Sequence, residues 1–531
     1  MGGDRVVYIG LDACDPAVAQ RFAAEGVMPH LARLLETSAR APVENAYGLF
    51  VGALWVSFGT ALRAERHGFH CWDEIDPATY TYRLNTPDIG HLPQFWDAIS
   101  AAGRRVAVID VPHMIADRPL DGFQLCEWGC HDKHHGLHSW PPEKAGQLAD
   151  EFGLHPALMG EGDPYAPRDF APDDVIHREG DHRTREEECA LTSGMIVGAR
   201  AKRAMLGTVL EREAPDLMVA VYAEGHSTGH QQWHLHDARH PRHDAATVAA
   251  MGGDPLAQVY AELDRGLGDM MAALGDDALL LVHLSHGMGP HYDATHMLDE
   301  VLRRLEREAQ GGVEVALRDH PVKRLARPFV PVLERMADAV RLPKAIRARL
   351  RKGLVTQAEE VRAGQRFFME PNNTVYGGIR LNLVGREPQG RVTADEADAV
   401  IAELEAALLE IVNVETGKPI VRALERCDRW HRRSPGDTMP DLLIDWERSV
   451  PVSTVSSPRI GTLHMPDLQH RTGDHRPAGL LVAHGPGMRA GERMPALAVE
   501  DIGPSIAARL GVRLSDVDGR PAAWLAGEMV S

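Results

Sequence analysis

Histidine is the residue type whose number and placement in this chain first point to chemistry. The sequence has 28 histidines, many of them bunched in residues 126–138, 226–243 and 283–296. Neutral imidazole binds zinc and other borderline cations well, so the bunching favours a metal site. His226 and His230 have the i, i+4 spacing that places two side chains on one face of a helix. A solvated surface pair is the alternative for these two residues.

Three short apolar runs end next to side chains that can bind metal or transfer protons. The runs and their following side chains are residues 6–11 with Asp12, 216–222 with Glu224 and His226, and 278–284 with Ser285 and His286. Continuous apolar runs of this length are typical of strands covered on both faces of a parallel sheet. Ligands of open α/β sheets gather outside the carboxyl ends of the strands, so these runs indicate one shared site.

The segments between these runs predict the helices of an α/β fold. Helical apolar spacing is found in residues 29–36, 92–102 and 255–274. Strands that alternate with such helices predict a mostly parallel central sheet flanked by helices. Residues 300–364 are rich in Arg and Leu and lack strand-like runs, which favours a helical insertion. We therefore expect three parts: 1–299 and 365–531 as the two portions of the α/β core, and 300–364 as the insertion.

Composition and charge limit the partners of the chain. It is 44% hydrophobic and 25% charged, as soluble globular proteins are, with a net charge of −19. A negative field disfavours nucleic acid and gives no attraction to an anionic membrane. No apolar run approaches the roughly 20 residues of a membrane span, and no signal-peptide apolar region is recognisable. With only six cysteines, we expect a cytoplasmic protein that acts on a small anionic molecule; the oligomeric state stays open.

Four motifs in chain order carry a resemblance to a known family. They are Ile-Gly-Leu-Asp at 9–12 with residues 26–34, Trp55-Val-Ser-Phe-Gly-Thr with 66–68, residues 378–390, and Gly-Asp-His-Arg-Pro-Ala-Gly at 473–479. Together they resemble the type I phosphodiesterase/nucleotide pyrophosphatase branch of the alkaline-phosphatase superfamily, over nearly the whole chain. The resemblance implies an alkaline-phosphatase-like sandwich. It also implies two divalent ions about 4 Å apart that stabilise the attacking and leaving oxygens.

One of the two metal sites implied by the resemblance is incomplete in this sequence. Asp12 and His286 match two of its ligands, whereas Ser285 stands where the family carries Asp. We expect Asp12 and His286 to support a second ion. The site is weak, empty or completed by residues outside the motifs.

The other implied site becomes a three-histidine site. His230 and His475 match family ligands, and His226 stands where the family carries Asp. Three histidines with an open position can hold zinc and lower the pKa of a bound water to about 7. We predict that these residues bind the main ion, with zinc favoured and manganese or iron as alternatives.

The position of the family's nucleophile is occupied by Val51, four residues before Trp55. Valine cannot attack phosphorus or sulfur, and we interpret Ser57 as a structural helix residue and Cys14 as a small buried one. A metal-bound hydroxide is the simplest replacement.

Three further residues complete the candidate site. Glu224 is a candidate general base, or a partner that orients a ligand; Asn373 and Arg386 are candidate substrate contacts, although Arg386 could instead anchor a loop. The sequence thus predicts a metal-dependent hydrolase or transferase of a phosphate, phosphonate or sulfate ester. A non-hydrolytic metalloenzyme on the same scaffold and a non-catalytic binding relative are the alternatives.

Overall fold

The computed structural model describes most of the chain in two compact units. The described residues are 5–71, 73–76, 78–84, 91–130, 134–156, 163–165, 183–274, 278–309, 362–372, 375–434, 436–467 and 471–527. Unit 1 comprises Met1–His70, Pro87–His291 and Leu468–Ser531, and unit 2 comprises Cys71–Thr86 and Tyr292–Asp467. The predicted insertion at 300–364 falls largely outside the described residues, so the three-part division of the chain stays a prediction.

Unit 1 is built on a nine-stranded sheet of order β20-β2-β19-β9-β1-β8-β5-β6-β7. The five central strands are parallel to one another: β9 (Ala278–Leu284), β1 (Arg5–Leu11), β8 (Leu217–Tyr222), β5 (Val106–Ile109) and β6 (Gly122–Cys126). The outer strands are β20 (Leu497–Ala498), β2 (Ala39–Glu44), β19 (Gly479–His484) and β7 (His138–Trp140). A separate antiparallel pair joins β10 (Gly287–Pro290) to β18 (Gly473–Arg476). The predicted mostly parallel sheet is confirmed.

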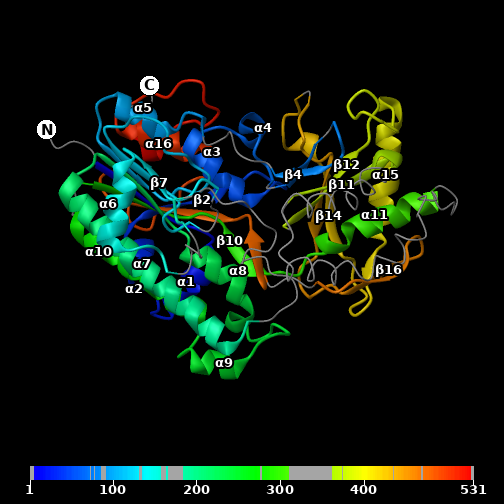
Figure 1. The fold of residues 1–531 in the computed structure, drawn as a ribbon, viewed down its shortest axis with the longest axis horizontal. Helices are drawn as coiled ribbons and strands as arrows, with labels where there is room; N and C mark the ends of the chain where they lie inside the picture. The colour runs from blue at the N-terminus through cyan, green and yellow to red at the C-terminus, as the bar shows by residue number, and fades with distance from the viewer. Residues whose placement is uncertain are drawn as a thin grey trace. The chain divides into compact units, whose positions relative to one another are not determined.

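Helices cover both faces of this sheet (Figure 1). One group contains α1 (Pro16–Ala24), α2 (Pro29–Thr37), α6 (Glu143–Phe152), α7 (Arg185–Glu213), α8 (Glu224–His236) and α10 (Pro255–Leu274). The other contains α3 (Leu54–Thr60), α5 (Phe95–Ala101) and α16 (Ile502–Arg509). Helices α2, α5 and α10 confirm the helical spacing found in the sequence.

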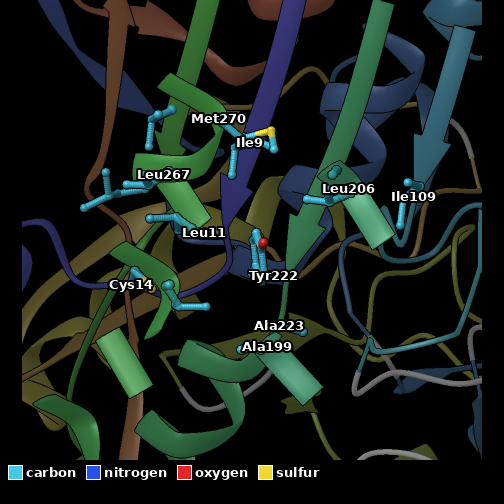
Figure 2. Packing of buried hydrophobic residues seen from close by; sticks show 14 of the residues in the cluster. Ile9, Leu11, Cys14, Ile109, Ala199, Leu206, Tyr222, Ala223, Leu267 and Met270 are labelled. Carbon is cyan, nitrogen blue, oxygen red and sulfur yellow. The ribbon is translucent and has the colours of Figure 1, made fainter. Parts of the chain in front are cut away.

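Burial on both faces explains why the central strands are apolar throughout. Every residue of β8 and β9 is buried. Figure 2 shows the core on one face, where Leu267 and Met270 of α10 pack around Ile9 and Leu11 of β1. On the other face, Tyr8 stacks on Phe58 of α3 with ring centroids 4.5 Å apart. Each large apolar side chain buried in this way contributes roughly 1.5–3 kcal/mol.

Unit 2 has its own sheet and core. Four antiparallel strands follow the order β11-β12-β15-β14: Phe367–Glu370, Tyr376–Leu381, Leu442–Trp446 and Val421–Arg426. Helices α11 (Thr295–Ala309) and α15 (Ala394–Leu409) contribute buried leucines to its core. No helix among the described residues of the chain has the length and apolarity needed to cross a membrane.

Candidate metal centre

The parallel register of unit 1 brings three of the predicted ligands to one edge of the sheet. The last residues of β1, β8 and β9 are register partners. Asp12 directly follows β1, and its N–H donates to Tyr222 O over 2.9 Å. His226 lies in the first turn of α8, just after β8, and His286 lies two residues beyond β9. The shared site that the three apolar runs predicted therefore forms in the structure.

His230 and His475 reach the same point from α8 and from β18. His230 lies one turn beyond His226 on α8, so both rings leave the same face of the helix. Its Nε2 is 2.7 Å from His226 Nε2 and 2.8 Å from His475 Nε2. The Nε2 atoms of His226 and His475 are 3.0 Å apart. All three side chains are buried, so the histidines that the sequence assigned to the main ion converge.

The hydrogen bonds of these rings leave nitrogen lone pairs facing one another. His230 Nδ1 lies 2.7 Å from Gly473 O, and His226 Nδ1 lies 2.6 Å from Asp12 Oδ2. A ring that donates from Nδ1–H carries its lone pair on Nε2 when it is neutral. Lone pairs at such short distances repel unless a cation lies among them. The donor set therefore fits a divalent ion of the zinc type.

Burial keeps His230 and His475 in the neutral form that binds metal. Desolvation, with a smaller effect from Arg471 and the neighbouring rings, holds the pKa of His230 well below 6.5. Desolvation likewise holds the pKa of His475 well below 6.5, and His286 and His226 act in the same direction. Protonated imidazole cannot bind a cation, so a lowered pKa favours a metal-binding role.

A second group of possible ligands contains Asp12, His226 and His286. One ligand atom from each of the three lies within 4.8 Å of the others. Burial opposes ionisation of Asp12, but the charges and hydrogen bonds of His226 and His286 outweigh it and hold the pKa of this carboxyl well below its usual value. Two other donors reach the carboxylate: Trp55 Nε1–H at 2.9 Å and the Ser285 hydroxyl at 3.2 Å.

The segment at the nucleophile position presents apolar side chains. Val51 begins the short helix Val51–Ala53 and is buried. The ring of the preceding Phe50 lies 6.4 Å from the ring of His475, which places this segment beside the histidine cluster. Ser57 Oγ lies 2.9 Å from His67 Nε2, which belongs to no metal-compatible group among the described residues. Burial raises the pKa of the Cys14 thiol far above its usual value, so this cysteine is not a thiolate.

Glu224 lies in a buried group of charges behind the start of α8. Its Oε1 is 3.4 Å from His155 Nε2. Burial opposes ionisation of Glu224, but the nearby Lys202 and His155 outweigh it and lower the pKa of the carboxyl. Lys202 Nζ donates to Val221 O over 2.7 Å and pairs with Asp110 Oδ2 at 2.9 Å. Glu224 is the first residue of α8, and its neighbours His155 and Lys202 lie on other elements, so its predicted role as base or orienting partner stays a prediction.

Arg386 and Asn373 were the predicted substrate contacts. Arg386 belongs to unit 2, where its guanidinium donates to both carboxylate oxygens of Asp441 at 2.7 Å and to Leu381 O at 2.7 Å. It also donates to Glu387 Oε1 at 2.8 Å. These bonds anchor the loop around residue 386, which was the alternative role for this arginine. Asn373 lies outside the described residues.

The sequence did not reveal that Arg471 lies at the cluster. Its Nη2 is 2.6 Å from His230 Nε2 and 2.9 Å from His230 Nδ1, so the guanidinium lies against this ring. Arg471 lies four residues before His475, just outside the motif that begins at Gly473. Trp55 belongs to the motif that follows position 51, but the sequence does not show that its indole N–H donates to Asp12.

The chain is similar to a known family and to solved structures over most of its length. The family model described as type I phosphodiesterase / nucleotide pyrophosphatase matches residues 6–475. No curated protein matches. Among solved structures, the chain is similar to murine ectonucleotide pyrophosphatase / phosphodiesterase 5 (13% identity, 97% of each chain, TM-score 0.46) and to its human counterpart (12%, 97% of each, 0.44). It is also similar to phosphonoacetate hydrolase from Sinorhizobium meliloti 1021 (13%, 94% of each, 0.45).

Proposed function

Because the chain belongs to the type I phosphodiesterase / nucleotide pyrophosphatase family, we propose that it is a metal-dependent hydrolase or transferase of a phosphate, phosphonate or sulfate ester. The observation that carries the proposal is the convergence of the Nε2 atoms of His226, His230 and His475 within 3.0 Å of one another. A divalent ion bound there would polarise an ester oxygen and lower the pKa of a bound water to about 7. Zinc is favoured by the three imidazoles, and manganese or iron are alternatives.

The residues around the centre support attack by water rather than by a side chain. Val51 offers no nucleophilic atom, and the side chain before it, Phe50, is an apolar ring beside that of His475. A covalent intermediate of the kind formed by a Ser or Thr nucleophile is therefore not part of the proposal. In its place, a metal-bound hydroxide is the proposed attacking group.

The position of Arg471 favours a small anionic substrate. Its guanidinium lies against the His230 ring, so a permanently charged side chain is in direct contact with the histidine cluster. A planar guanidinium binds phosphate or sulfate oxygens in a bidentate manner. This local charge would offset the repulsion of an anion by a chain with a net charge of −19.

The cytoplasm is the compartment that we propose. None of the six cysteines, all of which the structure describes, forms a disulfide, and five of them are buried. Buried cysteines without disulfides are typical of a reducing compartment. Nucleic acid and membranes are not among the proposed partners.

Metal analysis and an ester panel test this function. We expect the purified protein to contain a transition metal and to cleave a nitrophenyl ester of phosphate (mono- or diester) or sulfate. A chelator should abolish cleavage and added zinc should restore it. His230→Ala should lose the ion and the activity, because it removes one of three ligands. His243→Ala, which changes a histidine outside the cluster, should retain both.

Two results would favour the alternatives. A protein without bound metal, unaffected by His230→Ala, would be a non-catalytic binding relative. Bound metal with no cleavage of any ester in the panel would favour a non-hydrolytic metalloenzyme. His226 and Val51 favour this second alternative, because they stand where the family resemblance implies a carboxylate ligand and a nucleophile.

A further inference from the structure

The carboxylate of Asp12 is already occupied by donors from the protein. Oδ1 accepts the Trp55 indole N–H at 2.9 Å and the Ser285 hydroxyl at 3.2 Å. Oδ2 accepts the Nδ1–H of His226 at 2.6 Å. Asp12 has no exposed surface, so these contacts with protein groups define its environment. A carboxylate has about four lone-pair sites; Trp55, Ser285 and His226 use three of them, and His286 Nε2 lies 3.4 Å from Oδ1.

Ser285 replaces a carboxylate with a hydroxyl whose single proton is already used. Its hydroxyl proton is directed to Asp12 Oδ1, and its oxygen accepts the N–H of Ala13 at 3.2 Å. A hydroxyl has one proton to donate, and here that proton is directed to Asp12. Ser285 is neutral and buried, so it adds no charge that would attract a cation.

The two ring nitrogens of His226 face different partners. Nδ1 is directed to Asp12 Oδ2, and Nε2 lies among the nitrogens of His230 and His475. A carboxylate that accepts from the outer nitrogen of a metal-binding histidine fixes the ring, selects its tautomer and raises its basicity. Asp12 is placed to have this effect on the histidine that replaces the carboxylate ligand of the family.

We propose that the centre holds one ion, bound by His226, His230 and His475, and that Asp12 is a positioning residue for His226 rather than a metal ligand. Trp55 and Ser285 hold Asp12 in this position. The proposal rests on the metal centre of the proposed function and goes beyond it, because it removes the second ion that the family resemblance implies. In this proposal the group His226, His230 and His475 fits a divalent ion, whereas the group Asp12, His226 and His286 does not.

His286 alone remains for a second ion in this arrangement. Its Nε2 lies 3.4 Å from Asp12 Oδ1, and its Nδ1 lies 3.0 Å from Gly287 O. An ion among Asp12, His226 and His286 would need His226 Nδ1 as a ligand, so the proton now directed to Asp12 would have to leave. Loss of that proton turns His226 into an imidazolate bridge between two ions. Ser285 supplies a neutral hydroxyl where a carboxylate would add negative charge. The site is therefore less able to stabilise two neighbouring cations.

The number of bound ions tests the proposal directly. The whole chain is freed of metal, titrated with Co²⁺ and followed by visible absorption, and metal per chain is measured by mass spectrometry after removal of unbound ions. We expect saturation at one equivalent per chain. Saturation at two would overturn the single-ion proposal and leave the proposed hydrolase function standing, whereas no binding would overturn both.

Asp12→Asn separates a positioning role from a ligand role. Asparagine carries no charge and has one acceptor oxygen, so it can accept from His226 Nδ1–H or from Trp55 Nε1–H but not from both, and the variant should bind one equivalent with affinity lowered roughly 10- to 100-fold. Ser285→Ala is the matched control: it removes one donor to Asp12, leaves the Asp12–His226 bond in place, and should lose less affinity. A drop from two equivalents to one in Asp12→Asn would identify Asp12 as a ligand and overturn the proposal.

Discussion

Ser285 satisfies two neighbours at once, the Asp12 carboxylate and the Ala13 N–H. A carboxylate at this position would lie beside Asp12, and two adjacent carboxylates in a buried site repel each other unless a cation lies between them. The identity of residue 285 therefore decides whether the protein can stabilise a second positive charge near His286. The buried position of Asp12 strengthens this effect, because charges interact more strongly away from water.

Ser285→Asp should create the second site. It introduces the carboxylate that the family resemblance implies at this position and adds the charge that Ser285 lacks. We expect Co²⁺ binding to rise from one to two equivalents per chain, and in the metal-free state we expect a lower melting temperature from repulsion with Asp12. Ser285→Asn, similar in size but neutral, is the control and should stay at one equivalent. A Ser285→Asp variant that folds and still binds one equivalent would show that residue 285 does not limit the second site.

Close contact between α8 and β18 brings His230 and His475 together. A Cβ on Gly473 would lie 2.1 Å from Gly229 O and 2.9 Å from Trp233 Cβ, so the strand can approach the helix only if residue 473 has no side chain. The carbonyl of the same Gly473 accepts the Nδ1–H of His230. One backbone position therefore sets both the distance between the elements and the tautomer of a ligand.

Gly473→Ala should separate β18 from α8 and weaken metal binding. Overpacking against a backbone oxygen costs roughly 1–3 kcal/mol, and the displacement moves His475 away from His226 and His230. We expect Co²⁺ affinity to fall by roughly tenfold or more. In Gly146→Ala the new methyl group on α6 meets no atom within 4 Å, so this control should keep its affinity and melt at the same or a slightly higher temperature, because alanine favours a helix more than glycine does. Equal affinity in both variants would contradict the argument.

The sequence predicted the elements better than their contacts. Apolar runs 278–284 and 216–222 became β9 and β8, because a strand covered on both faces must be apolar along its whole length. The partners of Asp12 could not be predicted in this way. Trp55 and Ser285 lie 43 and 273 residues from Asp12, and only the folded register of β1 and β9 brings Ser285 to it. Ligand types were visible in the sequence, but their hydrogen bonds were not.

At the scale of the whole molecule, negative charge is the dominant feature of the composition. The chain has 76 acidic and 57 basic residues. Most acidic residues can ionise in water at little cost, but burial opposes ionisation unless neighbouring charges or hydrogen bonds outweigh it. Glu370 in β11 of unit 2 is buried, and its Oε1 accepts the N–H of Ile75 at 2.9 Å. Desolvation raises the pKa of Glu370 to about 8, although Arg380 acts in the opposite direction.

This buried carboxyl should make the stability of the protein fall as the pH rises. Glu370 stays protonated in the folded protein up to a pKa of about 8, whereas it ionises near 4.5 once unfolded. Between these pH values the unfolded chain holds fewer protons, so the free energy of unfolding decreases with increasing pH. Glu370→Gln stays neutral at both pH values and should not lose stability in this way. Its free energy of unfolding should exceed that of the wild type by more than about 1 kcal/mol at pH 8, and by less at pH 5.

Melting temperatures of both proteins at the two pH values measure the difference, with Glu405→Gln on the exposed face of α15 as the control. A difference between Glu370→Gln and the wild type that is equal at both pH values would mean that Glu370 is ionised in the folded protein.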